Sequence, residues 1–383
     1  MKFLQIFSGS LGRDPRPTRF YSLLRSLGSV TVCAAPPVAD FETPEEFFDL
    51  CQTSHSLSRR IRRAAGLLCH RYEQDIWTSR RREIFECLKG RDFSAIICQE
   101  GLLVPLALAI REARANAGKP CPVILDAREY YPRQFEQKFL WRSVLGGINR
   151  YVCRKYFPQL DHIFTVSPGL AQGYKKEYGL HCDLLPSYPY YQQITPAPVH
   201  DGPLRCIHHG AASPGRKLEA MIEAFRMLEG VATLDIMLVP NNPAYYDSLR
   251  QRGKSATNIF FRDPVPMMEI VNYIKRYDMG IFLLPDNTFN HRHCLPNKFF
   301  EYIQARLGLV ISPLPDMSAI LRQHDLGVIT EDFTPQALAS AIRSLTPESI
   351  ARFKSNAHSV AQSLCWEQNE EHLRETLFSL MRP

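Results

Sequence analysis

The 383-residue sequence has no long hydrophobic run and no closely paired cysteines, and these absences exclude several classes of protein. Without about 18 consecutive apolar residues, no membrane-spanning helix is expected. The 11 cysteines are scattered and form no CxxC pair, which argues against a zinc site and a disulfide framework. The apolar N-terminal run is short and no small-residue cleavage site follows it, so no signal peptide is expected. We therefore expect a protein of the reducing cytoplasm that holds no metal.

A dinucleotide-binding motif is also missing. An oxidoreductase of the dinucleotide class would carry GxGxxG after its first strand. The sequence SGSLG supplies Gly9 and Gly12 there but not the full pattern. That class stays a rival interpretation, and binding of NAD would identify it.

Positive charge is unevenly spread along the chain. The net charge is +7, and the whole excess lies in residues 1–190. It gathers in two stretches that contain Arg59, Arg60, Arg62, Arg63, Arg80, Arg81 and Arg82. Such clusters attract anionic lipid head groups, although a solvated helix face would look the same. Aromatic residues do not alternate with these arginines, so nucleic-acid binding is not expected.

Short apolar runs alternate with segments of helical spacing along nearly the whole chain. In the first half, strands are expected at residues 3–7, 29–34, 95–99, 122–127 and 162–167. A long helical region is expected between the last two, ending near Phe157. In the second half, strands are expected at residues 204–210, 233–239, 258–261, 279–284, 309–312 and 327–330. This alternation predicts parallel sheets covered by helices.

A polar, proline-rich stretch without periodicity, residues 184–203, separates the two halves. We expect an N-terminal domain at 1–186, a linker at 187–203 and a C-terminal domain at 204–363. The predicted fold class is α/β, with two Rossmann-like, doubly wound domains facing across a cleft. Ligands of such sheets bind at the carboxyl ends of the strands.

One candidate site follows the strand at 204–210, which ends in His-His-Gly. Gly210 would let a ligand approach the backbone closely. Arg216 and Lys217, at the start of the next helix, could grip a diphosphate by a planar fork and a point charge. A plain strand–loop–helix turn with solvated basic residues is the alternative.

A second candidate is the helix predicted to end at Gly308. Its first turn carries Asn297, Lys298 and Glu301. A helix N-terminus suits a phosphate, and Glu301 suits the paired hydroxyls of a sugar. The alternative is that Glu301 pairs only with Lys298 or Arg306.

Taken in order, several stretches are similar to the motifs of one known family. They are DPRPTRFYSLLRSLGSVTVCA, CQEGLLVPLALAI, ILDAREYYP, IFTVSPGLAQGY, GRKLEAMIEAF and PNKFFEYIQARLGLVIS. Over nearly its whole length the chain resembles a GT-B glycosyltransferase of the retaining, family-four kind. The resemblance implies that residues 364–383 form a helix returning to the N-terminal domain.

The resemblance also implies an activity. A sugar would move from a nucleoside-diphosphate-sugar to an acceptor hydroxyl, with retention, in the assembly of a surface polysaccharide or glycolipid. No DxD motif occurs, which fits a reaction without metal. A saccharide or lipid-linked acceptor would bring the protein to the inner face of the membrane, where the arginine clusters could meet it.

Carried over to this sequence, the resemblance implies a set of site residues. Those on the donor side are Gly9, Gly12, His209, Gly210, Arg216, Lys217, His293, Asn297, Lys298 and Glu301. The candidate catalytic carboxylates are Asp126, Glu129 and Glu100, and the acceptor-side residues are Arg128 and Tyr130. Tyr130, with Tyr131 and Trp141, could equally serve packing.

Three departures from the family pattern bear on activity. His293 stands where the family often has a sugar-contacting glutamate, and Arg128 stands where a histidine is common. Lys217 directly follows Arg216, whereas the wider superfamily spaces these two cations apart. The departures keep open an alternative function, a catalytically silent nucleotide-sugar-binding subunit that partners an active transferase.

Overall fold

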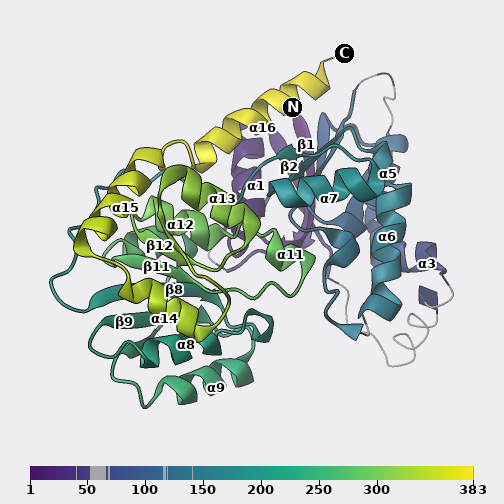
Figure 1. The fold of residues 1–383 in the computed structure, drawn as a ribbon. Coiled ribbons are helices and arrows are strands. Elements are labelled where there is room, and N and C mark those ends of the chain that lie inside the picture. Colours follow the sequence, from purple (N-terminus) through teal and green to yellow (C-terminus); the bar gives the residue numbers. More distant parts are fainter. Residues whose placement is uncertain are drawn as a thin grey trace. The chain divides into compact units, whose positions relative to one another are not determined.

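The computed structural model describes residues 1–39, 41–51, 66–67, 70–114, 118, 120–139 and 141–382. The chain divides into two compact units, each with its own sheet (Figure 1). The first unit contains Met1–Pro186, Thr288–Asn290 and Glu370–Pro383. The second unit contains Ser187–Asn287 and His291–Asn369. Residues 187–203, which carry no helix or strand, therefore belong to the second unit.

The sheet of the first unit has seven parallel strands among the described residues, in the order β3-β2-β1-β4-β5-β6-β7. Their bounds are β1 Lys2–Ser10, β2 Ser29–Ala35, β3 Glu46–Asp49, β4 Ala95–Cys98, β5 Val123–Ala127, β6 His162–Thr165 and β7 Asp183–Leu184. The chain winds from β1 toward one edge and then from β4 toward the other. The switch point therefore lies between β1 and β4, where ligands of open α/β sheets bind.

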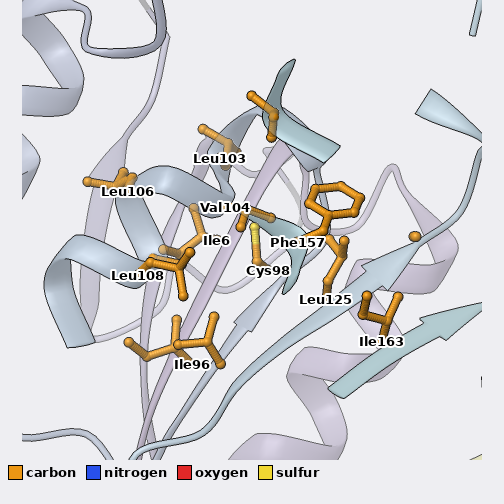
Figure 2. Close-up of a cluster of buried hydrophobic side chains, with 14 of the residues drawn as sticks. Ile6, Ile96, Cys98, Leu103, Val104, Leu106, Leu108, Leu125, Phe157 and Ile163 are labelled. Atoms are coloured by element: carbon orange, nitrogen blue, oxygen red, sulfur yellow. The ribbon is translucent and has the colours of Figure 1, made fainter. Parts of the chain in front are cut away.

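Helices cover both faces of this sheet. They are α1 Pro15–Leu27, α3 Tyr72–Ile76, α4 Ser79–Leu88, α5 Val104–Glu112, α6 Gly146–Lys155, α7 Pro168–Tyr178 and α16 Trp366–Met381. Figure 2 shows the core on one face, where strand residues such as Ile96 and Leu125 pack with Val104 and Leu108 of α5. Sequence signals set the ends of α7: a proline follows Ser167, and Gly179 caps it with φ 68°.

The sheet of the second unit has six parallel strands in the described chain, in the order β10-β9-β8-β11-β12-β13. Their bounds are β8 Leu204–Ala211, β9 Ala232–Val239, β10 Ile259–Arg262, β11 Met279–Phe282, β12 Gly308–Ile311 and β13 Gly327–Ile329. Here the switch point lies between β8 and β11, so both units follow the doubly wound plan.

Successive strand residues in the second unit contribute their side chains to two separate hydrophobic cores. Cys206 and Ile281 belong to the core that includes Phe225, whereas Ile207 and Phe282 belong to the other. Alternate side chains of a strand point to opposite faces, so the sheet is covered on both sides. The helices are α8 Glu219–Arg226, α9 Pro243–Gly253, α10 Ile270–Ile274, α11 Phe289–Arg292, α12 Asn297–Gln304, α13 Pro315–His324, α14 Pro335–Arg343 and α15 Pro347–Val360.

The prediction of a long helical region ending near Phe157 is wrong. The α-helix is confined to α6, and the chain before it forms a 3-10 turn at Tyr131–Arg133 and a π-helical turn at Trp141–Leu145. Pro132 has no N–H to donate, and two glycines stand at Gly146 and Gly147. The short strands β3 and β7 were not predicted: β7 has only two residues, and β3 has acidic residues at both ends and therefore shows no apolar run.

The prediction that Gly308 caps the preceding helix is also wrong. Gly308 is the first residue of β12, and a Cβ there would lie 2.6 Å from the sulfur of Met279. The left-handed residue after α12 is Arg306, with φ 61°. Its guanidinium donates to the carbonyl of Gln304 at 2.5 Å and to that of Gln192 at 2.7 Å, so the arginine itself caps the helix.

Within the described ranges, no helix is both long and apolar enough to cross a bilayer. The arginines of the first basic cluster, Arg59, Arg60, Arg62 and Arg63, lie outside those ranges. Arg80, Arg81 and Arg82 each donate to a backbone carbonyl of the first unit. These three guanidiniums therefore support local structure, whatever else they contact.

Candidate functional site

The second unit gathers cationic side chains at its switch point, which we call the cationic site. His208, near the end of β8, places Nδ1 2.8 Å from the carbonyl oxygen of Ile281 in β11. Lys298, in the first turn of α12, places Nζ 3.4 Å from Nε2 of the same imidazole. It also lies 4.8 Å from the ring centroid of Phe282. The ammonium is thus held over the junction of the two central strands.

Gly210 allows a second cation to join Lys298. Its φ of 140° is in the region that favours glycine. A Cβ at this position would lie 2.6 Å from Nζ of Lys298 and 3.3 Å from Nη1 of Arg216. The two cations therefore approach one bare stretch of backbone from different elements, α12 and the loop after β8.

The cationic site holds two basic side chains whose pKa values are shifted by their surroundings. Lys298 is only 5% exposed, and burial, reinforced by the charge of Arg216, holds its pKa well below the usual range. Burial also lowers the pKa of Arg216. The carboxylate of Glu301 acts in the opposite direction and raises the pKa of Lys298. Since isolated buried charges are costly, the arrangement is suited to receive an anion.

The histidines beside these cations are held neutral. Burial, followed by the charges of Lys298 and Arg216, places the pKa of both His208 and His209 well below the usual range. His209 Nε2 lies 3.4 Å from Oε2 of Glu301, so this contact joins a carboxylate to a neutral ring. Because both histidines are neutral, negative charge at the cationic site can come from a ligand. His208 was not among the predicted site residues, although it belongs to the same His-His-Gly sequence.

The other predicted donor-side residues occupy different environments. The Oδ1 of Asn297 is buried and has no hydrogen-bond partner among the described atoms. His293 places Nδ1 2.7 Å from Oδ2 of Asp316, the second residue of α13. Lys217 is exposed and adopts a left-handed φ of 52°, so it lies outside the buried cluster. Among the basic residues predicted for the donor side, Arg216 and Lys298 are the two that the fold brings together.

In the first unit, two carboxylates and an arginine meet at the corresponding switch point. Glu100 follows β4 and accepts a hydrogen bond of 3.2 Å from Ser8 in β1. Arg128, just after β5, donates to the carbonyl of Gln99 at 3.4 Å. Burial raises the pKa of Glu100, although the charge of Arg128 lowers it. Burial also raises the pKa of Glu129, and the negative charge of Glu100 adds to that effect.

Asp126 is placed differently from these two glutamates. It is fully buried and forms a two-pronged pair with Arg16 of α1, with Nη2 2.7 Å from Oδ1 and Nε 2.8 Å from Oδ2. Gln99 donates to the same carboxylate at 2.9 Å. With its oxygens occupied in this way, Asp126 holds α1 and β4 at the edge of the sheet. From the sequence we predicted that Asp126 is a catalytic candidate. Its surroundings in the structure are those of a structural carboxylate.

The N-terminal glycines and the tyrosine pair serve the framework of the first unit. A Cβ on Gly9 would lie 1.9 Å from Oδ2 of Asp14, and Gly12 has φ 81° in the turn before α1. Tyr130 and Tyr131 are buried in the core. Both rings thus contribute to packing, and an acceptor-side role for Tyr130 stays a prediction.

No model of a known protein family matches the sequence, and no curated protein matches it. Solved structures are similar in fold. Sucrose-phosphate synthase from Thermosynechococcus elongatus has a TM-score of 0.73 at 11% identity, with 99% of each chain covered. HepE from Anabaena, in complex with UDP-glucose, has a TM-score of 0.72 at 13% identity, covering 99% of this chain and 100% of that one.

Trehalose 6-phosphate synthase from Burkholderia multivorans has a TM-score of 0.66 at 11% identity, covering 99% and 98% of the two chains. These similarities at low identity establish the fold. The chain has the two-domain α/β fold of the GT-B glycosyltransferases, as the sequence predicted.

Proposed function

We propose that this protein is a glycosyltransferase that moves a sugar from a nucleoside-diphosphate-sugar to an acceptor hydroxyl. The observation that carries the proposal is the meeting of two basic side chains, Arg216 and Lys298, over the backbone of Gly210 at the switch point of the second unit. A diphosphate would supply negative charge there, with Arg216 as a fork and Lys298 as a point charge. The fold similarity to HepE, solved with UDP-glucose, supports this ligand class.

The same groups would assist the chemistry. Breaking the bond between sugar and diphosphate leaves negative charge on the leaving group, and preorganised cations and helix N–H groups stabilise such charge. Arg216, Lys298 and the first turn of α12 would do this without a metal ion. Asn297, Glu301 and His209 would contact the nucleotide or the sugar, and His293 would lie on the sugar side.

On the first unit, Glu100 and Glu129 are the proposed catalytic carboxylates. Burial raises the pKa of both carboxyl groups, as is common for groups that exchange protons in an active site. They would also oppose the positive charge that develops on the sugar in the transition state. Arg128 would orient them and the acceptor, while Asp126 would hold the framework. Retention of configuration follows only from the sequence resemblance and is part of the proposal.

We further propose that the acceptor is a saccharide or a lipid-linked saccharide of a surface polysaccharide or glycolipid. The arginine-rich stretches of the first half would bring the protein to the anionic inner face of the membrane. Binding to vesicles with and without anionic lipid, measured by sedimentation at low and high salt, tests this part separately from transfer.

The central test uses purified protein and a panel of UDP- and GDP-sugars. We expect thermal stabilisation by UDP or GDP, release of nucleoside diphosphate from one sugar donor, and loss of both in Arg216→Ala and Lys298→Met. Lys275→Met, at an exposed position of the second unit, is the matched control. Nucleotide binding without any turnover would instead favour the silent subunit. Stabilisation by NAD alone would favour the oxidoreductase.

A further inference from the structure

Side chains supply several hydrogen bonds of the turn formed by residues 128–133, in addition to the backbone bond from the amide of Arg133 to the carbonyl of Tyr130. The hydroxyl of Tyr174 donates to the carbonyl of Glu129 at 2.7 Å and accepts from the amide of Tyr131 at 3.1 Å. Asn149 donates to the carbonyl of Tyr131 at 3.0 Å. The position of Glu129 therefore depends on side chains that meet the backbone of the turn.

A further side chain in this set is Asn290, which lies 160 residues further along the chain than Tyr130. Its Oδ1 accepts from the amide of Tyr130 at 2.6 Å, and its Nδ2 donates to the carbonyl of Tyr130 at 3.2 Å. Nδ2 also lies 3.5 Å from the carbonyl oxygen of Arg133. One side-chain amide thus satisfies both backbone polar groups of the residue next to Glu129.

The residues beside Asn290 are fitted to the same place; we call Thr288–Asn290 the anchor segment. The amide of Phe289 donates to Oε1 of Glu136 at 2.5 Å, and its ring centroid lies 4.7 Å from that of Tyr130. The Phe289 ring packs against α7 at Gly173, which has no side chain. A Cβ there would lie 2.9 Å from the ring. Three kinds of contact therefore hold the anchor segment in the first unit.

The anchor segment belongs to the loop that leads to the cationic site. Helix α11 begins with Phe289 in the first unit and ends with Arg292 in the second. The same loop then carries His293 and enters α12, the helix of Lys298. The C-terminal half of the sequence thereby supplies part of the support for Arg128 and Glu129.

We propose that Asn290 is a positioning residue for the reaction. It fixes the 128–133 turn so that Arg128 and Glu129 keep the orientation that the acceptor side requires. The catalytic part of this inference rests on the proposed function, whereas the ordering of the turn does not. The two parts can therefore be tested separately.

The ordering is tested by amide hydrogen exchange, which needs no substrate. In Asn290→Ala the amide of Tyr130 loses its acceptor, and we expect exchange across residues 130–133 to become at least about tenfold faster. Asn287→Asp, an exposed asparagine of the same loop, is the control and should exchange like the wild type. Unchanged exchange in Asn290→Ala would overturn the inference, even if the protein proves to have no transferase activity.

The catalytic part is tested with Asn290→Asp. This variant keeps an oxygen that can accept from the amide of Tyr130. It loses the hydrogen bonds that Nδ2 donates, because a carboxylate oxygen then faces the carbonyl oxygens of Tyr130 and Arg133. With any donor that the wild type uses, we expect kcat to fall about tenfold and the acid limb of the pH profile to move. The Kd for the nucleoside diphosphate should stay the same. A lower Tm with unchanged kcat and pH profile would show a merely structural role and refute positioning.

Discussion

Gly210 and Lys298 lie close together near the end of β8, where a Cβ on residue 210 would lie 2.6 Å from the ammonium nitrogen and the backbone φ is 140°. Gly210→Ala should therefore displace Lys298 or Arg216 and remove stabilisation by UDP or GDP. Gly215→Ala is the control, because a Cβ at that position has no neighbour within 4 Å. Thermal shift with and without nucleotide measures both. Normal nucleotide binding by Gly210→Ala would contradict the proposed diphosphate site.

The depressed pKa of Lys298 predicts how nucleotide binding depends on pH. A bound diphosphate favours the protonated lysine, so binding raises this pKa and takes up a proton. Affinity should therefore fall as pH rises above the lowered pKa of the free protein. Calorimetry in buffers of different ionisation enthalpy detects the uptake. Lys298→Met should bind at least about tenfold more weakly and lose this uptake. Proton release on binding by the wild type would be inconsistent with the prediction.

Lys217 occupies a left-handed backbone position, with φ 52°. That conformation costs a residue with a Cβ about 1–2 kcal/mol, partly offset by the greater entropy that glycine loses on folding, about 0.5–1 kcal/mol. Lys217→Gly should therefore stabilise the protein by about 0.5–1 kcal/mol in urea denaturation, whereas Lys217→Ala should not. Since both variants lack the ammonium, a shared loss of nucleotide affinity would assign Lys217 a part in donor binding.

Asp126 and Arg16 form the buried ion pair of the first unit, with exposed fractions of 0% and 3%. Asp126→Asn leaves the guanidinium without a counter-charge, and we expect a loss of about 3–5 kcal/mol in the free energy of unfolding. The exposed pair of Arg25 and Glu45 provides the control, since Glu45→Gln should cost less than about 1 kcal/mol. Equal effects of the two substitutions would show that the buried pair contributes no special stability.

The sequence was sufficient to predict what local pattern controls. The alternation of apolar runs and helical segments predicted the two doubly wound sheets, because apolar residues recur with a different spacing in strands and in helices. Arg216 and Lys298 belonged to two separate candidate sites, which only the family resemblance placed together on the donor side, and the structure brings their side chains to the same backbone at Gly210. Asp126 shows what such local patterns leave out. Its partner Arg16 is 110 residues away, and no local pattern distinguishes a paired carboxylate from a catalytic one.

Asn290 shows a second limit. Nothing in the sequence around it marks an amide that will bind the backbone of Tyr130, since that contact depends on tertiary packing alone. The 128–133 turn illustrates the same limit. Side chains that are distant in the sequence supply several of its hydrogen bonds, and a periodic pattern cannot reveal them.

The first unit is not a contiguous piece of the polypeptide. It needs Thr288–Asn290 and also Glu370–Pro383, where Leu373 and Leu377 are fully buried. A fragment ending at Pro186 would lack the acceptor for the amide of Tyr130 and two apolar side chains of its core. Cutting the gene at the junction of the two sheets should therefore give an incomplete N-terminal product. Its recovery would depend on complementation by the rest of the chain.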